Sequence, residues 1–236
     1  MRSVASIPLL IPFYRFIYPS VCFVCDAPLA ETGDRVCADC WSSIKQISTD
    51  DALYREMHGR LLSSGVISEL ISAYHFEKDG TLQSVIHQLK YDGSTHLGVE
   101  LGKRLGVRIV SQLQGMHVDA VLPVPLHPLK QRERGYNQSE HICEGIRSVF
   151  GLNVLPSLLR RRKYTQSQTH LTSEERRMNV GDAFEINPML TEFVSHHTFL
   201  IVDDVITTGA TIESCARVLM DNHARGVIAC SVALAA

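Results

Sequence analysis

The chain has no long hydrophobic run and no excess of charge of either sign. None of its apolar stretches reaches the roughly 18 to 20 residues that cross a bilayer, so we expect no membrane span. Its 23 Lys and Arg residues against 25 Asp and Glu residues give a net charge of -2, which disfavours a protein whose main task is to coat nucleic acid. A hydrophobic content of 45% with 20% charged residues excludes disorder, collagen and coiled coil as descriptions of the whole chain.

Two common nucleotide-binding patterns are also missing. No G-x-G-x-x-G occurs, so a dinucleotide site has no support. Gly102-Lys103 does not complete a Walker motif, because only three residues separate Gly98 from Gly102 and Arg104 stands where Ser or Thr is required.

The N-terminal segment, in which Met1-Arg2 precedes an uncharged apolar run, resembles a short secretory signal peptide, but three features argue against one. Pro8 and Pro12 interrupt the uncharged run from Ser3 to Tyr14, Arg15 ends it, and no small-residue cleavage site follows closely. We therefore expect an apolar leader that packs against the body of the protein.

Four of the seven cysteines have a spacing typical of a zinc site. Two C-x-x-C turns separated by 11 residues can each present two thiolates to one ion, at about 2.3 Å. The predicted ligands are Cys22, Cys25, Cys37 and Cys40. Because sulfur fills all four positions, the zinc is expected to be structural and to supply folding free energy in so short a segment. Two disulfides or a set of redox-active thiols are the alternatives.

The other three cysteines, Cys143, Cys215 and Cys230, lie in segments with apolar periodicity and are expected to be small core residues. Free thiols and a zinc site both indicate a reducing compartment, so we predict a cytoplasmic protein.

From about residue 61 the sequence alternates between strand and helix patterns. Strands are expected at 67–76, 118–124, 154–159, 199–202 and 227–234, with helices at 82–89 and 95–113 and others opening near Asn137 and Ile212. This alternation predicts an α/β fold with a doubly wound parallel sheet. We place the leader, the zinc module and a helical connector in residues 1–60, and the α/β domain in 61–236.

The residues that follow the 199–202 strand carry the strongest functional signal. Asp203 and Asp204 are expected at the carboxyl edge of the sheet, where open α/β folds bind ligands. A turn then opens a helix, and its N–H groups, hydroxyls and helix dipole favour a phosphate. The turn contains Thr207, Thr208, Gly209 and Thr211. Carboxylates beside a phosphate repel it unless they bind its hydroxyls or a Mg²⁺ that it carries, so the pattern predicts a ribose phosphate. The alternative is that the acids cap a turn and the threonines are ordinary N-caps.

A second polar segment follows the 118–124 strand. It is stiffened by prolines and contains Pro125, Leu126, His127, Lys130, Arg132 and Arg134. Such a cluster of cations is often only a solvated face. Here it leaves a strand near the same edge as Asp203, and guanidinium groups suit a pyrophosphate.

A third stretch, from Arg160 to Arg177, carries six cations and two anions and is poor in glycine. Its composition is typical of a loop that closes over a substrate. The candidate flap residues are Arg162, Lys163, Gln168, Arg176 and Asn179.

The segment from Phe199 to Thr211 resembles the motif with which type I phosphoribosyltransferases bind phosphoribosyl pyrophosphate (PRPP). The resemblance implies the type I phosphoribosyltransferase fold. It also implies that Asp203 and Asp204 face the ribose hydroxyls and that the threonines and Gly209 surround the 5′-phosphate.

A narrower resemblance covers almost the whole chain. The four cysteines, the Arg-Gly-Tyr-Asn-Gln run after the proline-rich loop, the Gln-x-x-Leu and Arg-x-x-Asn groups of the flap and the PRPP motif together resemble the competence protein F family. The resemblance implies a PRPP loop from Asp203 to Thr211, which includes Val205 and Ala210, and a pyrophosphate loop around Pro125 to His127. It also implies a link to the uptake or use of external DNA.

Three functions are compatible with these patterns. The first is an enzyme that transfers phosphoribosyl from Mg²⁺-PRPP to an unidentified nitrogen acceptor and releases pyrophosphate, with Asp203, Asp204, Arg132 and Arg134 as the catalytic candidates. No convincing general base is evident. The second is a PRPP-dependent regulatory module that transfers nothing. The third is a protein that handles single-stranded DNA through its basic loops, with other competence proteins as partners, although few aromatic residues lie near those loops.

Overall fold

The structure is a computed structural model of the whole chain, and it describes residues 20–29, 35–113, 115–161 and 183–236. The predicted leader lies outside the described residues, as do the candidate flap residues Arg162, Lys163, Gln168, Arg176 and Asn179. Within the described part of the chain, no helix is both long enough and apolar enough to cross a bilayer.

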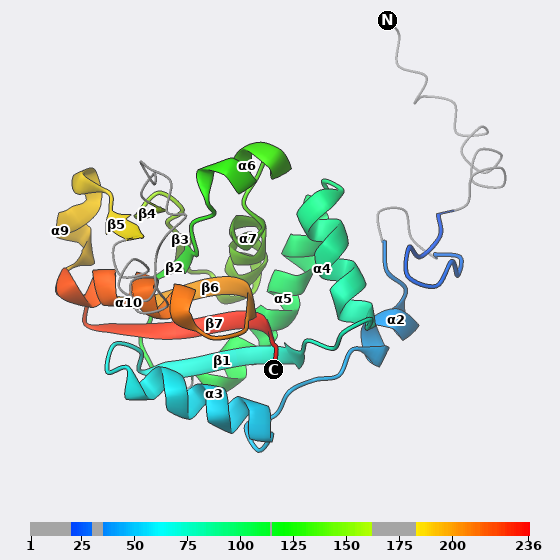
Figure 1. Cartoon of the computed structure of the whole chain (residues 1–236), viewed down its shortest axis with the longest axis horizontal. Helices are drawn as coiled ribbons and strands as arrows, with labels where there is room; N and C mark the ends of the chain where they lie inside the picture. The colour runs from blue at the N-terminus through cyan, green and yellow to red at the C-terminus, as the bar shows by residue number, and fades with distance from the viewer. Residues whose placement is uncertain (1–19, 30–34, 114, 162–182) are drawn as a thin grey trace, which may run out of the picture.

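A five-stranded parallel sheet forms the centre of the molecule (Figure 1). Its strands, in spatial order, are β1 (Glu69–His75), β7 (Gly226–Leu234), β6 (Thr198–Ile206), β2 (Ala120–Pro123) and β3 (Asn153–Val154). Every neighbouring pair runs parallel. The central strands are buried almost throughout, as expected for a parallel sheet covered on both faces. The predicted doubly wound α/β sheet is confirmed.

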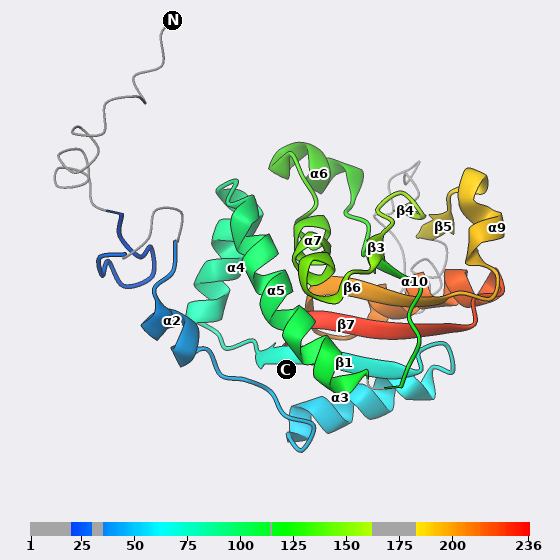
Figure 2. The ribbon, with the colours of Figure 1, turned by 180° about the vertical axis from the view of Figure 1, so that it is seen from behind.

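Helices cover both faces of this sheet (Figures 1 and 2). One face packs against α4 (Thr81–Tyr91), α5 (Thr95–Gln112) and α7 (Gln138–Phe150). The opposite face packs against α3 (Ala52–Ser63) and α10 (Ala210–Asp221). The predicted domain boundary near residue 60 falls within α3, which lies against β1.

Shorter elements complete the described fold: α2 (Ala38–Ser43), α6 (Pro128–Arg134), β4 (Leu159–Arg161), β5 (Phe184–Ile186), the 3₁₀ turn η2 (Pro188–Leu190) and α9 (Thr191–Val194). β4 and β5 form a separate antiparallel pair that the sequence did not predict. The strand expected at 154–159 is wrong, because a turn separates β3 from β4. Pro156 lies in this turn and has no N–H to continue a ladder.

The glycines of α5 allow α7 to pack unusually close. A Cβ on Gly102 would lie 2.0 Å from the carbonyl oxygen of Ile142, and one on Gly145 would lie 2.1 Å from that of Val99. Gly102 on α5 and Gly145 on α7 therefore mark a close contact between the backbones of the two helices.

Candidate functional site

Strand β6 carries the acidic pair within its length. The sequence placed the strand end at residue 202, but pairing with β7 continues through Val205 and Ile206. Because successive side chains of a strand point to opposite faces, Asp203 and Asp204 lie on different faces of the sheet. Asp203 lines a small cavity formed with residues 205–212, whereas Asp204 faces α4.

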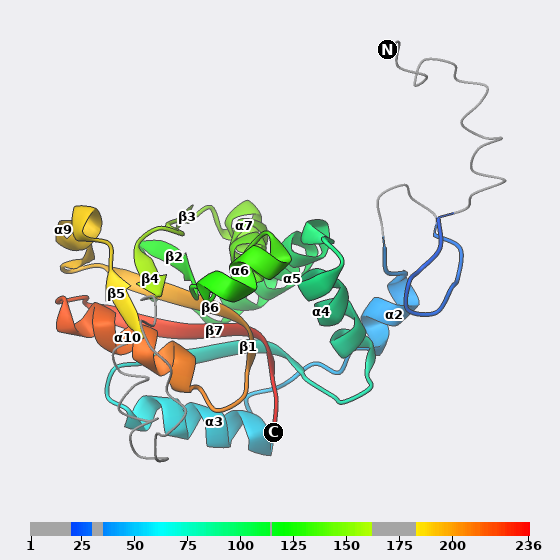
Figure 3. The same cartoon turned by 45° about the horizontal axis from the view of Figure 1, so that its top comes forward.

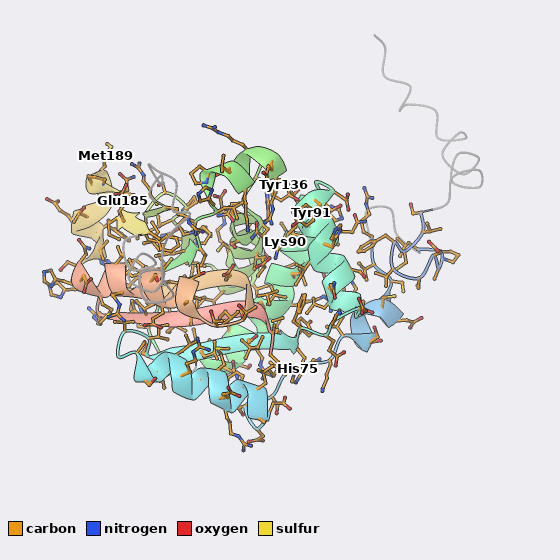
Figure 4. All side chains as sticks on the ribbon, in the orientation of Figure 1. His75, Lys90, Tyr91, Tyr136, Glu185 and Met189 are labelled. Atoms are coloured by element: carbon orange, nitrogen blue, oxygen red, sulfur yellow. The ribbon has the colours of Figure 1, made fainter. Side chains whose placement is uncertain are left out.

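Asp204 is held by a lysine that the sequence analysis did not single out. Nζ of Lys90 lies 2.5 Å from Oδ2 of Asp204, and the two side chains are 23% and 7% exposed. Lys90 is in the last turn of α4, at the corner where Figure 4 also labels Tyr91 and Tyr136. A signal was present, because Lys90 stands four positions after the buried Ile86 and therefore on the same face of the helix. The ion pair leaves Asp203 as the more accessible of the two acids.

Burial, together with the negative charge of Asp204, raises the pKa of Asp203 to about 7. The N–H of Asp204 donates to Oδ1 of Asp203 at 2.9 Å, which offsets part of this effect. A hydroxyl donor or a cation placed against Asp203 would stabilise its charged form.

The turn after β6 has a backbone that only glycine adopts easily. Gly209 has φ of 73°, and a Cβ at this position would lie 2.6 Å from Cδ2 of Leu61 on α3. α10 starts at the next residue. The side chains of Thr207, Thr208 and Thr211 are exposed around this turn. The N–H of Ala210 donates to Oγ1 of Thr208 at 3.5 Å, and the threonine hydroxyls and the next N–H groups of α10 can donate to an anion.

The proline-rich segment leaves the sheet beside this turn. β2 pairs directly with β6, and the N–H of Val124 donates to the carbonyl oxygen of Val202 at 2.9 Å. Pro125, Leu126 and His127 follow and are half-buried. The structure therefore brings the predicted pyrophosphate loop and Asp203 to neighbouring positions of one edge.

The cations that follow lie on a helix. The sequence treated Lys130, Arg132 and Arg134 as part of a loop, but they belong to α6, which starts with Pro128 and is capped by Nδ1 of His127. Figure 3 shows α6 beside the upper end of α4. Arg132 is exposed on this helix.

Arg134 is fixed in place. Its guanidinium carbon lies 5.2 Å from the ring centroid of Tyr91 on α4, and its Nη1 donates to Oε1 of Gln138 at 2.9 Å. These contacts connect α6 to the residue that follows Lys90.

Tyr136 and Asn137 strengthen the same connection. The hydroxyl of Tyr136 donates to the carbonyl oxygen of Leu89. Asn137 caps α7, and its Nδ2 donates to the carbonyl oxygen of Val124 at 3.0 Å. The Arg-Gly-Tyr-Asn-Gln run therefore ties the exit of β2 to the end of α4 that carries Lys90.

The four predicted zinc ligands form one cluster. The sulfur atoms of Cys22, Cys25, Cys37 and Cys40 all lie within 4.8 Å of one another, close to the separation of about 3.8 Å expected around a tetrahedral zinc. The N–H groups of Cys37 and Cys40 lie 3.3 Å and 3.4 Å from the sulfur atoms of Cys22 and Cys37. Burial raises the pKa of the Cys40 thiol, and the neighbouring sulfurs raise it further. Four thiolates this close need a cation, so the donor set fits a zinc ion.

Comparison with known proteins identifies this module. A family described as the double zinc ribbon domain matches residues 13–51. Together with the four-cysteine cluster, this match supports a structural zinc.

Two kinds of curated relative match the chain. Competence protein F of Haemophilus influenzae is 34% identical over 101 residues, which are 43% of this chain and 44% of that protein, so this match spans less than half of either. The DNA utilization protein YhgH of Salmonella typhimurium is 26% identical over 220 residues, which are 89% of this chain and 94% of that protein. The protein of the same name from Escherichia coli K12 is 25% identical over 223 residues, with the same coverage. The predicted resemblance to the competence protein F family is confirmed.

Solved structures of phosphoribosyltransferases also match, at low similarity. The glutamine PRPP amidotransferase of B. subtilis is 18% identical, with a TM-score of 0.39 over 58% of this chain and 26% of that one. The hypoxanthine phosphoribosyltransferase of Trypanosoma cruzi is 13% identical, with a TM-score of 0.38 over 58% of this chain and 64% of that one. TM-scores this low do not establish a shared fold. The α/β fold is assigned from the strand order described above.

Proposed function

We propose that this chain, a relative of competence protein F and of the DNA utilization proteins, binds Mg²⁺-PRPP at the carboxyl edge of its sheet. We further propose that it transfers the phosphoribosyl group to a nitrogen acceptor and releases pyrophosphate. The observation that carries the proposal is the turn from Thr207 to Thr211, which forms a cavity with Asp203 at the start of the 12-residue helix α10.

The 5′-phosphate of PRPP fits this turn. Exposed threonine hydroxyls surround it, and the N-terminus of α10 adds N–H donors and a favourable dipole. Gly209 adopts the positive φ that the turn requires, and any larger residue at this position would also meet Leu61.

Asp203 is positioned to accept hydrogen bonds from the ribose hydroxyls. It shares the cavity with the turn, so one sugar phosphate can contact both. Its carboxylate is also a suitable oxygen donor for Mg²⁺. When bound, Mg²⁺ would neutralise charge on the pyrophosphate as it leaves. Asp204 has a different task, because its charge is already paired with Lys90.

In the reaction, the bond between ribose C1 and the pyrophosphate oxygen breaks, and a bond from the acceptor nitrogen to C1 forms. The acceptor nitrogen loses its proton to water. Positive charge develops on the ribose ring, and the carboxylate of Asp203 stabilises it through the ring hydroxyls. Arg132 and Arg134 of α6 supply positive charge toward the departing pyrophosphate, and the contacts of Arg134 with Tyr91 and Gln138 orient it.

A thermal-shift measurement tests binding. PRPP with Mg²⁺ at a hundred times its Kd stabilises a protein by about 2.7 kcal/mol, which raises Tm by roughly 5–10 °C in a chain of this size. Asp203→Asn should lose this shift, whereas Asp221→Asn, an exposed acid at the end of α10, should keep it. No shift in the unmodified protein, or the same shift in Asp203→Asn, would contradict the proposed site.

A pyrophosphate-release assay over a panel of nitrogenous bases and amines tests transfer. Release that depends on both PRPP and an acceptor supports the enzyme. A protein that binds PRPP but releases no pyrophosphate with any acceptor would instead be a PRPP-dependent regulatory module.

A further inference from the structure

A second cavity, of about 470 Å³, lies between the zinc ribbon and the first turns of α5. Its size is within the range of small-molecule sites. None of its lining residues belongs to the proposed PRPP site at the carboxyl edge. The residues used below are Arg35 and Trp41 from the ribbon side and Glu100, Lys103 and Arg104 from α5.

The cavity is positively charged in a chain that is slightly acidic overall. Arg35, Lys103 and Arg104 face a single carboxylate, Glu100. Nη2 of Arg104 lies 3.1 Å from Oε1 of Glu100, so this acid is already paired. Arg35 and Lys103 are exposed, and no carboxylate pairs with either among residues 20–29, 35–113, 115–161 and 183–236. Two cations are therefore available to a ligand with phosphate groups.

The same cavity contains the only tryptophan of the chain. The guanidinium of Arg104 lies over the Trp41 ring, 4.2 Å from its centroid, and Nε of Arg104 is buried with no hydrogen-bond partner among the residues that the structure describes. An aromatic ring with a stacked guanidinium offers the flat surface on which nucleic-acid bases stack. Trp41 lies on α2, one residue after the zinc ligand Cys40, so the ribbon holds the ring against α5.

We infer that this cavity binds a nucleotide unit of a single-stranded nucleic acid. Arg35 and Lys103 contact its phosphates, and one unpaired base stacks at the pair formed by Trp41 and Arg104. A base within a duplex cannot reach this surface, because both of its faces are already stacked. The site is separate from the PRPP site and does not depend on the proposed function.

The single tryptophan makes binding directly measurable. Titration of the full chain with a twelve-nucleotide oligothymidylate should quench the fluorescence of Trp41 and saturate. The charge-reversal variant Arg35→Glu/Lys103→Glu should raise Kd at least tenfold. It should also reduce the slope of log K against log salt by about 1.4, since each phosphate contact with a single strand contributes about 0.7.

A matched control changes the net charge of the protein by the same amount as the charge-reversal variant does. Arg55→Glu/Arg225→Glu reverses two exposed cations outside the cavity and should leave Kd within about twofold. A neutral variant, Arg35→Gln/Lys103→Gln, should lose the same salt-slope contribution without added repulsion. Zinc content and thermal unfolding of each variant are compared with those of the unmodified protein to check that the variant is folded.

Three results would overturn the inference: no quenching by the oligonucleotide, an unchanged Kd in both cavity variants, or an equal loss in the control variant. Thymidine monophosphate and a duplex of equal length identify the source of the nucleotide. Tighter binding of the single strand than of either supports the assignment, whereas equal or tighter binding of the monophosphate or the duplex refutes it.

Discussion

The ion pair between Lys90 and Asp204 joins a helix end to the sheet edge, and its removal should have a large effect. Lys90→Met takes away the ammonium group that lies 2.5 Å from a carboxylate with only 7% exposure. Removal of one partner from a buried pair typically costs 3–5 kcal/mol, because the other charge is left buried without compensation. Lys90 is 23% exposed, so solvent screens part of the pair, and we expect a loss of about 3 kcal/mol in the free energy of unfolding.

This loss should appear as a fall in Tm of roughly 6–12 °C, since 1 kcal/mol corresponds to about 2–4 °C in chains of 150–250 residues. Urea unfolding of the zinc-loaded protein gives the free energies directly. The double variant Lys90→Met/Asp204→Asn should be more stable than the sum of the two single changes implies, by about 2 kcal/mol, because it leaves no charge unpaired. Lys90→Arg keeps the charge and should retain most of the stability.

Additive effects would refute this reasoning. If the double variant loses the sum of the two single losses to within about 0.5 kcal/mol, the two side chains do not interact in the folded protein. In that case Asp204 is an ordinary ligand-facing acid and not a partner of Lys90.

Three further predictions concern the turn, the acid and the zinc. Gly209→Ala should lower the free energy of unfolding by about 1–3 kcal/mol and remove the PRPP-induced thermal shift, because it combines a positive φ with a 2.6 Å contact to Leu61. Urea unfolding and the thermal shift with Mg²⁺-PRPP measure the two effects, and an unchanged shift in this variant would contradict the role of the turn. The affinity for Mg²⁺-PRPP should rise about tenfold between pH 6 and pH 8, because Asp203, with a pKa of about 7, must be ionised to accept hydrogen bonds from the ribose hydroxyls. The stability of the free protein should fall from about pH 4 to pH 7, because over this range Asp203 loses its proton in the unfolded chain but keeps it in the folded protein. Calorimetric titration measures the first trend and urea unfolding the second. Cys22→Ser/Cys40→Ser should reduce bound zinc to well below one equivalent in metal analysis. It should also make residues 20–48 sensitive to protease, because the metal supplies the folding free energy of this module. Full zinc occupancy in this variant would contradict the assignment of the ligands.

The sheet could be predicted from the sequence because its strands are continuous apolar runs. The limits of β6 could not, because Asp203 and Asp204 end the apolar pattern while the backbone continues to pair with β7 as far as Ile206. The sequence also gives no direct information on spatial order, so the position of β7 between β1 and β6 came only from the structure.

The sequence identified those site residues that belong to a short, recognisable sequence pattern. The turn from Thr207 to Thr211 and the zinc ligands have short, regular spacings. Lys90 has no such spacing, since its partner is 114 positions away in sequence and the contact depends on how α4 packs. The sequence analysis also missed helix α6, which follows the proline-rich segment. A signal was present, because His127 as N-cap and Pro128 in the first turn are typical of a helix start.

The position of β7 also constrains how the protein is made. Ser68, just before β1, contacts Val227, 159 positions later, and the edge of β6 is likewise completed by β7. During synthesis, β1 and β6 therefore leave the ribosome with open, apolar edges that can pair with other chains until residues 226–234 emerge. Such long-range pairing also slows folding, and we expect newly made chains to depend on a chaperone that shields these edges during that interval.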